Sequence, residues 1–338
     1  MKAIVKTQEG SGNVKLTEYE KPVPGRGEVR VAVKSAGVCG TDIKILRGDT
    51  WSNPPVVLGH EYSGVVDALG EDADAVKLGD RVISETGQSV CGQCYYCKTG
   101  RRLMCPNRLS IGYGVDGAFA EYIVVSQDIV HKIPDSISFD EAALCEPFAV
   151  ALHGVWDSVS LLPVDTALVT GPGAIGQLAA LAAKAKGAAV ILAGTPGDGE
   201  RLEIAARMGI EHTTANLNEG IVRDLTEGRG VDVAIDCTGA ESAIRQAIGL
   251  VRPAGKFVQI GLTKDALEID YALLTGREIS IVGSFGHQWH NWDHAIRLLA
   301  GGKVNVKPLI TGHYPIEKWE QAFDDMEKQR GIKILIHP

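Results

Sequence analysis

The stretch Thr166–Gly176, TALVTGPGAIG, decides the fold class that this sequence predicts. A short apolar run leads into three glycines that match the pattern G-x-G-x-x-G. Between a strand and a helix, the first glycine allows a tight turn, the second lets the backbone approach a pyrophosphate, and the third lets helix and strand pack closely. Free N–H groups at the helix start then face the phosphates. The pattern predicts a dinucleotide site at Gly171, Gly173, Ala174, Ile175 and Gly176. A glycine turn without a ligand is the alternative.

Strand-like and helix-like segments alternate on the carboxyl side of this stretch. Short apolar runs recur at Ala188–Ala193, Val231–Asp236, Lys256–Ile260 and Glu278–Val282. Such runs are typical of strands that are buried on both faces of a parallel sheet. We therefore expect an α/β domain with a doubly wound, Rossmann-type parallel sheet.

Residues 1–150 have a different pattern. Short β-rich runs at Glu28–Ser35, Tyr62–Ala68, Asp80–Ser84 and Ala120–Val125 are separated by turns that contain glycine or proline. This spacing predicts an antiparallel, partly barrel-like module. Two domains are also expected from the length of 338 residues, because single cores stop growing near about 250–300 residues.

Composition limits the classes of partner. The chain has 34 Lys and Arg against 42 Asp and Glu, a net charge of −8, and it has no basic run. Nucleic acids and acidic membranes bind clustered basic residues, so neither is expected as the main partner. The amino-terminal MKAIVKTQEG has no apolar signal core, and no stretch reaches the length of a membrane span. We expect a soluble, cytoplasmic protein that acts on a small molecule.

The end of the second strand of the α/β domain bears on the choice between NAD and NADP. NAD sites usually place Asp or Glu there to bind the ribose hydroxyls. Here Gly194 and Thr195 follow the strand, which leaves room for a 2′-phosphate that Thr195 and Arg201 could bind. This arrangement favours NADP. Asp198 or Glu200 could instead turn back to the ribose, and Arg201 could be a solvated helix residue.

Four of the seven cysteines lie within fifteen residues, at Cys91, Cys94, Cys97 and Cys105. Zinc accepts four thiolates in a tetrahedron, and such a closed shell leaves no position for a substrate. The odd number of cysteines and the absence of an export signal fit metal binding better than disulfides. The loop predicts a structural zinc site.

Other potential metal ligands are dispersed along the chain. Cys39-Gly-Thr-Asp42 follows a predicted strand, Gly59-His60-Glu61 comes about twenty residues later, and Glu146 precedes the α/β domain. Taken singly, each has an ordinary interpretation as a buried thiol, a hydrogen-bonded histidine or a solvated carboxylate.

These motifs occur together in the order found in the zinc-dependent medium-chain alcohol dehydrogenases. Over nearly its whole length the chain resembles that family in Cys39–Asp42, Gly59–Val66, the four-cysteine loop and the glycine-rich turn. It is most similar to the sorbitol/polyol and threonine dehydrogenase branch, because Glu146-Pro147 stands where ethanol-oxidising enzymes carry a cysteine ligand.

The resemblance implies two domains and an activity. Residues 1–150 and 295–338 would form a GroES-like, zinc-binding catalytic domain, and residues 151–294 a Rossmann domain. The activity would be hydride transfer between a secondary alcohol, a polyol or sugar alcohol, and NAD(P), giving a ketone. A threonine-type dehydrogenase that oxidises an amino alcohol is the alternative, and relatives are commonly homotetramers or dimers. A protein that kept the fold without the chemistry would lack a ligand, and none is missing.

The resemblance also implies the ligands of a second, catalytic zinc ion. Cys39 and His60 would bind it, and Glu61 or Glu146 would complete the protein shell. Asp42 would accept an N–H from His60. Thr41 would pass the substrate proton outward, although Lys44 stands where many relatives have the next member of the relay, a histidine.

Further cofactor contacts follow from the same resemblance. Lys333 matches a basic position that can reach the pyrophosphate, with an ordinary surface lysine as the alternative. The residues implied along the nicotinamide and ribose are Val150, Thr238, Gly239, Gly261, Leu262, Ser284 and Phe285.

Overall fold

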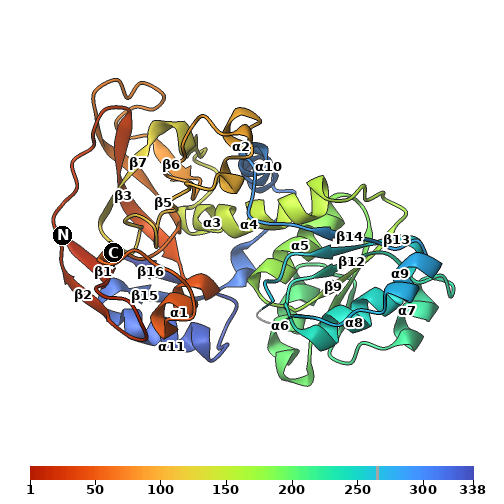
Figure 1. Ribbon diagram of the computed structural model, residues 1–338. Helices are drawn as coiled ribbons and strands as arrows, with labels where there is room; N and C mark the ends of the chain where they lie inside the picture. The colour runs from red at the N-terminus through yellow and green to blue at the C-terminus, as the bar shows by residue number, and fades with distance from the viewer. Residues whose placement is uncertain (264–265) are drawn as a thin grey trace. The chain divides into compact units, whose positions relative to one another are not determined.

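The computed structural model describes residues 1–263 and 266–338, and the chain divides into two compact units (Figure 1). Unit 1 comprises Met1–Glu146, Gln288–Gly302 and Leu309–Pro338. Unit 2 comprises Pro147–His287 and Lys303–Pro308. No helix in the described ranges is long and apolar enough to cross a membrane.

Unit 1 is built on two sheets. The seven-stranded sheet has the order β15-β16-β3-β5-β6-β8, and β7 also pairs with β3. Its strands are β3 (Glu28–Gly37), β5 (Glu61–Leu69), β6 (Arg81–Ser84), β7 (Tyr122–Ser126), β8 (Val130–Lys132), β15 (Ile310–Pro315) and β16 (Lys333–His337). All pairings in it are antiparallel except β15 with β16. The smaller sheet contains β1 (Lys2–Lys6), β2 (Val14–Glu18) and β4 (Val56–Val57).

Buried and more exposed side chains alternate along β3, and this alternation explains how unit 1 forms its core. Val29, Val31 and Val33 are buried, whereas the side chains between them are more exposed. A period of two directs the valines to one face of the sheet. There the apolar residues form a continuous cluster, in which Phe119 and Phe323 meet edge to face with ring centroids 5.8 Å apart. The helices of unit 1 are α1 (Gly40–Arg47), α2 (Tyr95–Lys98), α3 (Phe139–Ala143), α10 (Trp289–Ala300) and α11 (Trp319–Glu327).

Unit 2 is an α/β layer structure around a six-stranded sheet with the order β11-β10-β9-β12-β13-β14. Every pairing in this sheet is parallel. The strands are β9 (Thr166–Thr170), β10 (Ala189–Ala193), β11 (His212–Thr214), β12 (Val231–Asp236), β13 (Val251–Gln259) and β14 (Ser280–Gly283). In chain order this is 3-2-1-4-5-6, the order of doubly wound dinucleotide-binding folds. The predicted parallel sheet is therefore confirmed.

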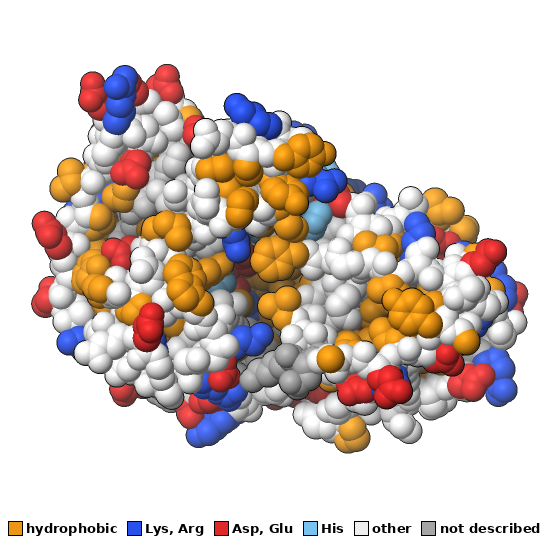
Figure 2. All heavy atoms as spheres, in the orientation of Figure 1, with side chains coloured by type: hydrophobic (Ala, Val, Ile, Leu, Met, Phe, Trp, Pro, Cys, Tyr) orange, Lys and Arg blue, Asp and Glu red, His pale blue; other side chains and the backbone are white. Residues whose placement is uncertain are grey.

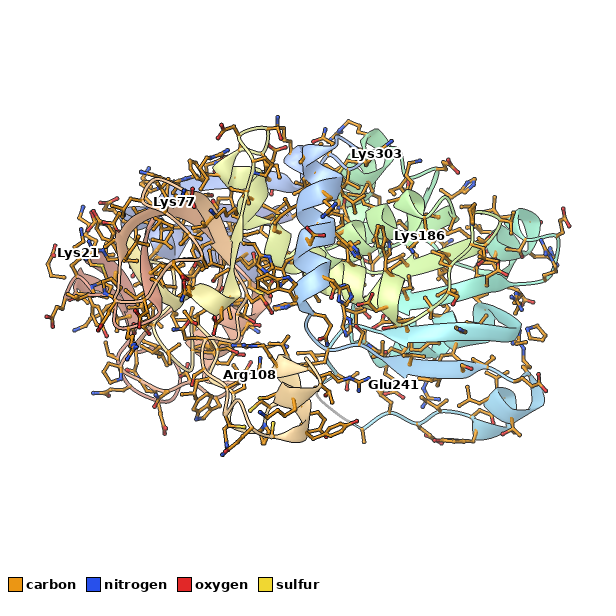
Figure 3. All side chains as sticks on the ribbon, turned by 90° about the horizontal axis from the view of Figure 1, so that it is seen from above. Lys21, Lys77, Arg108, Lys186, Glu241 and Lys303 are labelled. Atoms are coloured by element: carbon orange, nitrogen blue, oxygen red, sulfur yellow. The ribbon has the colours of Figure 1, made fainter. Side chains whose placement is uncertain are left out.

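Helices cover both faces of this sheet, because the chain winds outward from β9 in two directions. In Figure 3, Lys186, which follows α5, and Glu241, which opens α8, mark the two faces. The helices are α5 (Ala174–Ala185), α6 (Gly199–Arg207), α7 (Glu219–Leu225), α8 (Glu241–Leu250) and α9 (Tyr271–Gly276), while α4 (Cys145–Leu152) runs from the end of unit 1 into unit 2. The sheet is therefore a rigid base for the loops at its carboxyl edge.

Helix α10 begins in an aromatic and polar stretch of the sequence, with Trp289 as its first residue. Its first turn is fixed by a capping box, in which the Gln288 backbone N–H donates to the Asn291 side chain at 2.7 Å. Aromatic and histidine residues are weak helix formers, so this start depends on the cap and on burial of Trp292.

Charged side chains of both signs are interspersed over the face shown in Figure 2. This distribution agrees with the absence of a basic run in the sequence.

Candidate functional site

The four predicted cysteines of the loop converge. One Sγ atom from each of Cys91, Cys94, Cys97 and Cys105 lies within 4.8 Å of the others. Three of the Sγ–Sγ distances are 3.5, 3.6 and 4.0 Å, and four thiolates at tetrahedral zinc lie about 3.8 Å apart. Backbone N–H groups of Gln93 and Cys94 donate to Cys91 and lower the pKa of its thiol to about 6. The donor set fits zinc.

The dispersed residues Cys39, His60 and Glu61 also converge, and their ligand atoms lie within 4.8 Å of one another. Cys39 is the N-cap of α1, just after β3, and His60 directly precedes β5. The antiparallel register pairs Gly37 of β3 with Glu61 of β5. Residues twenty positions apart in the chain are thus brought to one end of a strand pair. His60 and Glu61 are buried, and Cys39 is partly exposed.

Asp42 lies behind this group and is fully buried. Its Oδ2 accepts the Cys39 backbone N–H at 2.8 Å, and its Oδ1 lies 3.7 Å from His60 Nδ1. Within the described part of the chain, neither Asp42 Oδ1 nor His60 Nδ1 has a hydrogen-bond partner. A small movement would let Nδ1–H donate to the carboxylate and leave Nε2 for a metal, as is usual for ligating histidines.

Burial raises the pKa of Asp42 to about 6, against the opposing effect of His60. Burial also raises the pKa of Glu146, to about 7, and the charge of Glu61 adds to this rise. Several buried acidic groups without enough cations would carry a large desolvation penalty. A divalent cation among Cys39, His60 and Glu61 would offset it, so the residues present fit zinc.

The two glutamates differ in position. Glu61 belongs to the convergent group. Glu146, at the start of α4, does not, because among the described residues its carboxylate is not within 4.8 Å of all the ligand atoms of that group. Glu146 is nevertheless buried and interacts electrostatically with His60. It is therefore close enough to influence the charge of the group, although its carboxylate is not among the converging ligand atoms.

Lys333 is the contact that sequence reasoning missed. It was expected to reach the pyrophosphate, yet its side chain is only 2% exposed and its Nζ donates to Glu61 Oε2 at 2.6 Å and to the Val38 carbonyl at 3.2 Å. Although burial lowers the pKa of Lys333, the charges of Glu61, Cys39 and Glu146 and the hydrogen bond to Glu61 together outweigh this effect, so the pKa is raised. The structure therefore places Lys333 as the counter-ion of Glu61.

Thr41 and Lys44 lie three residues apart on α1, and both are partly exposed. Residues with this spacing are neighbours on one face of a helix. Lys44 therefore follows Thr41 on the same face of α1.

In unit 2 the geometry at the three glycines of the turn fits the roles that the sequence predicts for them. Gly171 follows β9 with φ +94°, in the left-handed region that favours glycine. A Cβ atom at Gly176 would overlap the carbonyl oxygen of Gly171, so helix and turn require glycine there. A Cβ atom at Gly173 would meet no described atom within 4 Å. Gly173 is the N-cap of α5 and has no side-chain cap, and Ala174 and Ile175 form the first turn. This space and the free N–H groups suit a phosphate.

Asp236 organises the carboxyl edge of the sheet, and sequence reasoning did not single it out. Its Oδ1 accepts the hydroxyls of Thr170 at 2.8 Å and Thr238 at 2.6 Å. Its Oδ2 accepts the Gly239 N–H and the Gln259 amide, both at 2.8 Å. One buried carboxylate thus connects the ends of β9, β12 and β13. The signal in the sequence was an acidic residue that ends an apolar strand.

Four of the remaining predicted cofactor residues follow β13 and β14 at the same edge. Gly261 approaches Gly239 so closely that a Cβ atom would overlap the Gly239 nitrogen. Ser284 follows β14 and donates its backbone N–H to Gln259 at 2.9 Å, whereas Leu262 and Phe285 are exposed. Val150 lies on α4 and is partly exposed.

At the tip of β10 the structure places a carboxylate beside Thr195. The sequence left open whether Asp198 turns back to this point, and Asp198 Oδ2 accepts the backbone N–H of Thr195 at 2.8 Å and its hydroxyl at 2.7 Å. Arg201 Nη1 lies 3.5 Å from Asp198 Oδ1. A Cβ atom at Gly194 would lie 3.0 Å from the Asp198 Cβ. Asp198 therefore engages both residues that were expected to bind a 2′-phosphate.

Comparison with known proteins gives the family. Residues 25–135 match the alcohol dehydrogenase GroES-like domain, and residues 174–301 match the zinc-binding dehydrogenase domain. The chain is 39% identical over 342 residues to sorbitol dehydrogenase of Halalkalibacterium halodurans, covering 100% of this chain and 99% of the relative. This chain belongs to the zinc-dependent medium-chain alcohol dehydrogenase family. The predicted family and fold class are confirmed.

Further members of the family differ in substrate and cofactor. L-threonine 3-dehydrogenase of Pyrococcus horikoshii is 36% identical, covering 99% of this chain and 98% of the relative. A Sinorhizobium meliloti protein bound to NADP has a TM-score of 0.91 at 30% identity, covering 100% of this chain and 99% of that one. The structure of an alcohol dehydrogenase of Escherichia coli CFT073 with NADH has a TM-score of 0.91 at 31% identity, covering 100% of this chain and 99% of that one.

We predict that Gly176→Ala lowers the free energy of unfolding by about 1–3 kcal/mol, because the new Cβ overlaps the Gly171 carbonyl. Gly173→Ala is the matched control, because its Cβ enters open space and the fold should be unaffected. Thermal unfolding without added dinucleotide measures the difference. Equal midpoints for the two variants would contradict the packing role of Gly176.

Proposed function

We propose that this chain is a zinc-dependent, NAD(P)-dependent dehydrogenase that oxidises a secondary alcohol, of the polyol or sugar-alcohol class, to a ketone. The observation that carries the proposal is the convergence of Cys39, His60 and Glu61 in a chain that is similar to sorbitol dehydrogenase over its whole length. In this proposal unit 1 is the catalytic domain and unit 2 is the cofactor domain.

The proposed catalytic zinc is held by Cys39 and His60, with Glu61 or Glu146 completing the shell. Glu61 is supported as the third ligand because its carboxylate lies within 4.8 Å of the ligand atoms of Cys39 and His60. The bond from Lys333 to Glu61 supports the alternative, because it engages one carboxylate oxygen and so leaves a role for Glu146. The second proposed zinc is held by Cys91, Cys94, Cys97 and Cys105.

When bound, zinc supplies a Lewis acid that lowers the pKa of an alcohol, and the nicotinamide accepts the hydride. The chain's own residues orient and move protons around this chemistry. Asp42 fixes the ring of His60, and the Thr41 hydroxyl accepts the proton of the alcohol. Lys44 lies next to Thr41 on the helix, so the proton leaves to water along a different route from relatives that have a histidine there.

The dinucleotide is proposed to lie on unit 2, with its pyrophosphate at Gly171–Gly176 and α5. Thr238, Gly239, Gly261, Leu262, Ser284, Phe285 and Val150 are proposed to line the ribose and nicotinamide. Asp236 would position the first two of these through the hydrogen bonds given above. Lys333 remains a candidate for the pyrophosphate only if its bond to Glu61 breaks.

The choice between NAD and NADP depends on Asp198 in this proposal. The small residues at the tip of β10 favoured NADP, but the Asp198 carboxylate supports NAD, because it can bind ribose hydroxyls and repel a 2′-phosphate. A cytoplasmic location and a homotetramer or dimer stay predictions of the sequence.

Cys39→Ser should reduce the turnover of every alcohol to below about 1% of the wild type, because the Lewis acid is lost. Its metal content should fall by one zinc ion per chain, while the ion of the four-cysteine loop stays in place. Cys94→Ser is the reciprocal variant: it should lose the other ion and thermal stability. Elemental analysis and steady-state rates measure both. Full activity in Cys39→Ser would contradict the assignment.

A panel of polyols, secondary alcohols and L-threonine, scored by NAD(P)H absorbance, tests the substrate class. We expect the highest kcat/KM with a polyol, whose neighbouring hydroxyls can chelate a zinc ion with a carboxylate ligand. A higher value for threonine would favour the amino-alcohol alternative. No reduction of either cofactor by any member would contradict the proposed reaction.

Asp198→Ala should raise the ratio of kcat/KM with NADP to that with NAD on the order of tenfold, or 1.4 kcal/mol, because Thr195 and Arg201 are released for a phosphate. Glu203→Ala removes an equal charge from an exposed position on α6 and serves as the control. An unchanged ratio in Asp198→Ala would assign the preference to other residues.

A further inference from the structure

A third group of potential metal ligands lies in unit 1, and it shares no residue with either proposed zinc site. It consists of Asp140 on α3, His313 on β15 and His337 on β16. One ligand atom from each lies within 4.8 Å of the others. Neither the family motifs nor the proposed reaction uses these residues.

The parallel pairing of β15 with β16 creates the histidine pair. His313 is opposite Leu335, and Pro315 is opposite His337, so the two histidines are diagonal neighbours on one face of the sheet. Their rings are nearly parallel, at 13°, with centroids 5.4 Å apart. His313 Nδ1 lies 3.1 Å from His337 Nε2. Adjacent nitrogen ligands at tetrahedral zinc lie about 3.3 Å apart.

The tautomer of His337 is fixed by its other contact. Its Nδ1 lies 3.1 Å from the carbonyl oxygen of Lys34 on β3, which can only accept. Nδ1 therefore carries the proton, and the lone pair of Nε2 points to His313. Ligating histidines typically donate the other ring N–H to a backbone carbonyl or a carboxylate in this way.

Asp140 supplies an anionic oxygen to the same place. Its Oδ2 lies 3.8 Å from His313 Nδ1, the nitrogen that faces His337 Nε2. The side chains of Asp140, His313 and His337 are 35%, 53% and 35% exposed. Water can therefore reach the group and complete a coordination shell.

We propose that Asp140, His313 and His337 bind a divalent transition-metal ion of the zinc class. Two imidazoles with one carboxylate suit zinc, copper or nickel better than magnesium or calcium, which prefer oxygen ligands. The ion replaces the hydrogen bond between the two imidazoles and links α3 to the edge of the sheet. Because α3 leads directly into α4 and Glu146, a bound ion restrains the segment that carries a proposed catalytic residue.

The test uses the full-length, zinc-loaded enzyme equilibrated with buffered free Zn²⁺ and then analysed for metal per chain. We expect the wild type to hold one more zinc ion than His313→Ala, and a Zn²⁺-dependent rise in the unfolding temperature that His313→Ala loses. His337→Gln should behave as His313→Ala does. His212→Ala, on β11 of unit 2, is the matched histidine control and should retain the extra ion.

Equal zinc content and equal stabilisation in the wild type, His313→Ala and His337→Gln would overturn the proposal. Unfolding temperatures of the variants without added Zn²⁺ should match the wild type, which shows that they fold. The comparison is independent of the proposed reaction, since Cys39→Ser should lose its own ion and still retain the one held by His313. Failure of the catalytic assignment would leave the His313 difference intact.

Discussion

The antiparallel pairing of β3 with β5 is the constraint on which the proposed catalytic site depends. The register that sets Gly37 opposite Glu61 also brings Cys39, just beyond one strand, to His60, just before the other. The pairing tolerates no side chain at two points, because a Cβ at Gly37 would overlap Glu61 and a Cβ at Gly64 would overlap the Ala32 carbonyl. A slip of one residue would reverse the faces of the strand and separate the ligands.

Buried charge is the second consequence of this register. Asp42, Glu61 and Glu146 are all buried close to His60, and burial together with the charge of Glu61 raises the pKa of Asp42 and of Glu146. Lys333 compensates one of these charges from β16, which pairs with Ala36 and Gly37 at the same end of β3. The remaining negative charge is what a divalent cation would neutralise. Removing only one partner from such a group leaves an uncompensated charge, which is usually strongly destabilising.

Motifs with short, fixed spacing could be predicted from the sequence, and contacts that depend on tertiary register could not. The glycine turn, the parallel sheet and the four-cysteine loop follow from local periodicity and spacing. The partner of Lys333 is 272 residues away and depends on how β16 joins the sheet. The sequence shows that Asp198 is close to β10 in the chain. Its position at the tip of β10, however, depends on a capping contact with Thr195 that composition alone does not indicate.

Both units hold their functional loops by the same device, a buried aspartate that accepts backbone N–H groups at the end of a strand. Asp42 accepts the Cys39 N–H after β3, and Asp236 accepts the Gly239 N–H after β12. A carboxylate in this position fixes the loop and keeps a second oxygen for another group: the ring of His60 in one case, the hydroxyls of Thr170 and Thr238 in the other. The loops are therefore set before any ligand arrives, which reduces the ordering cost of binding.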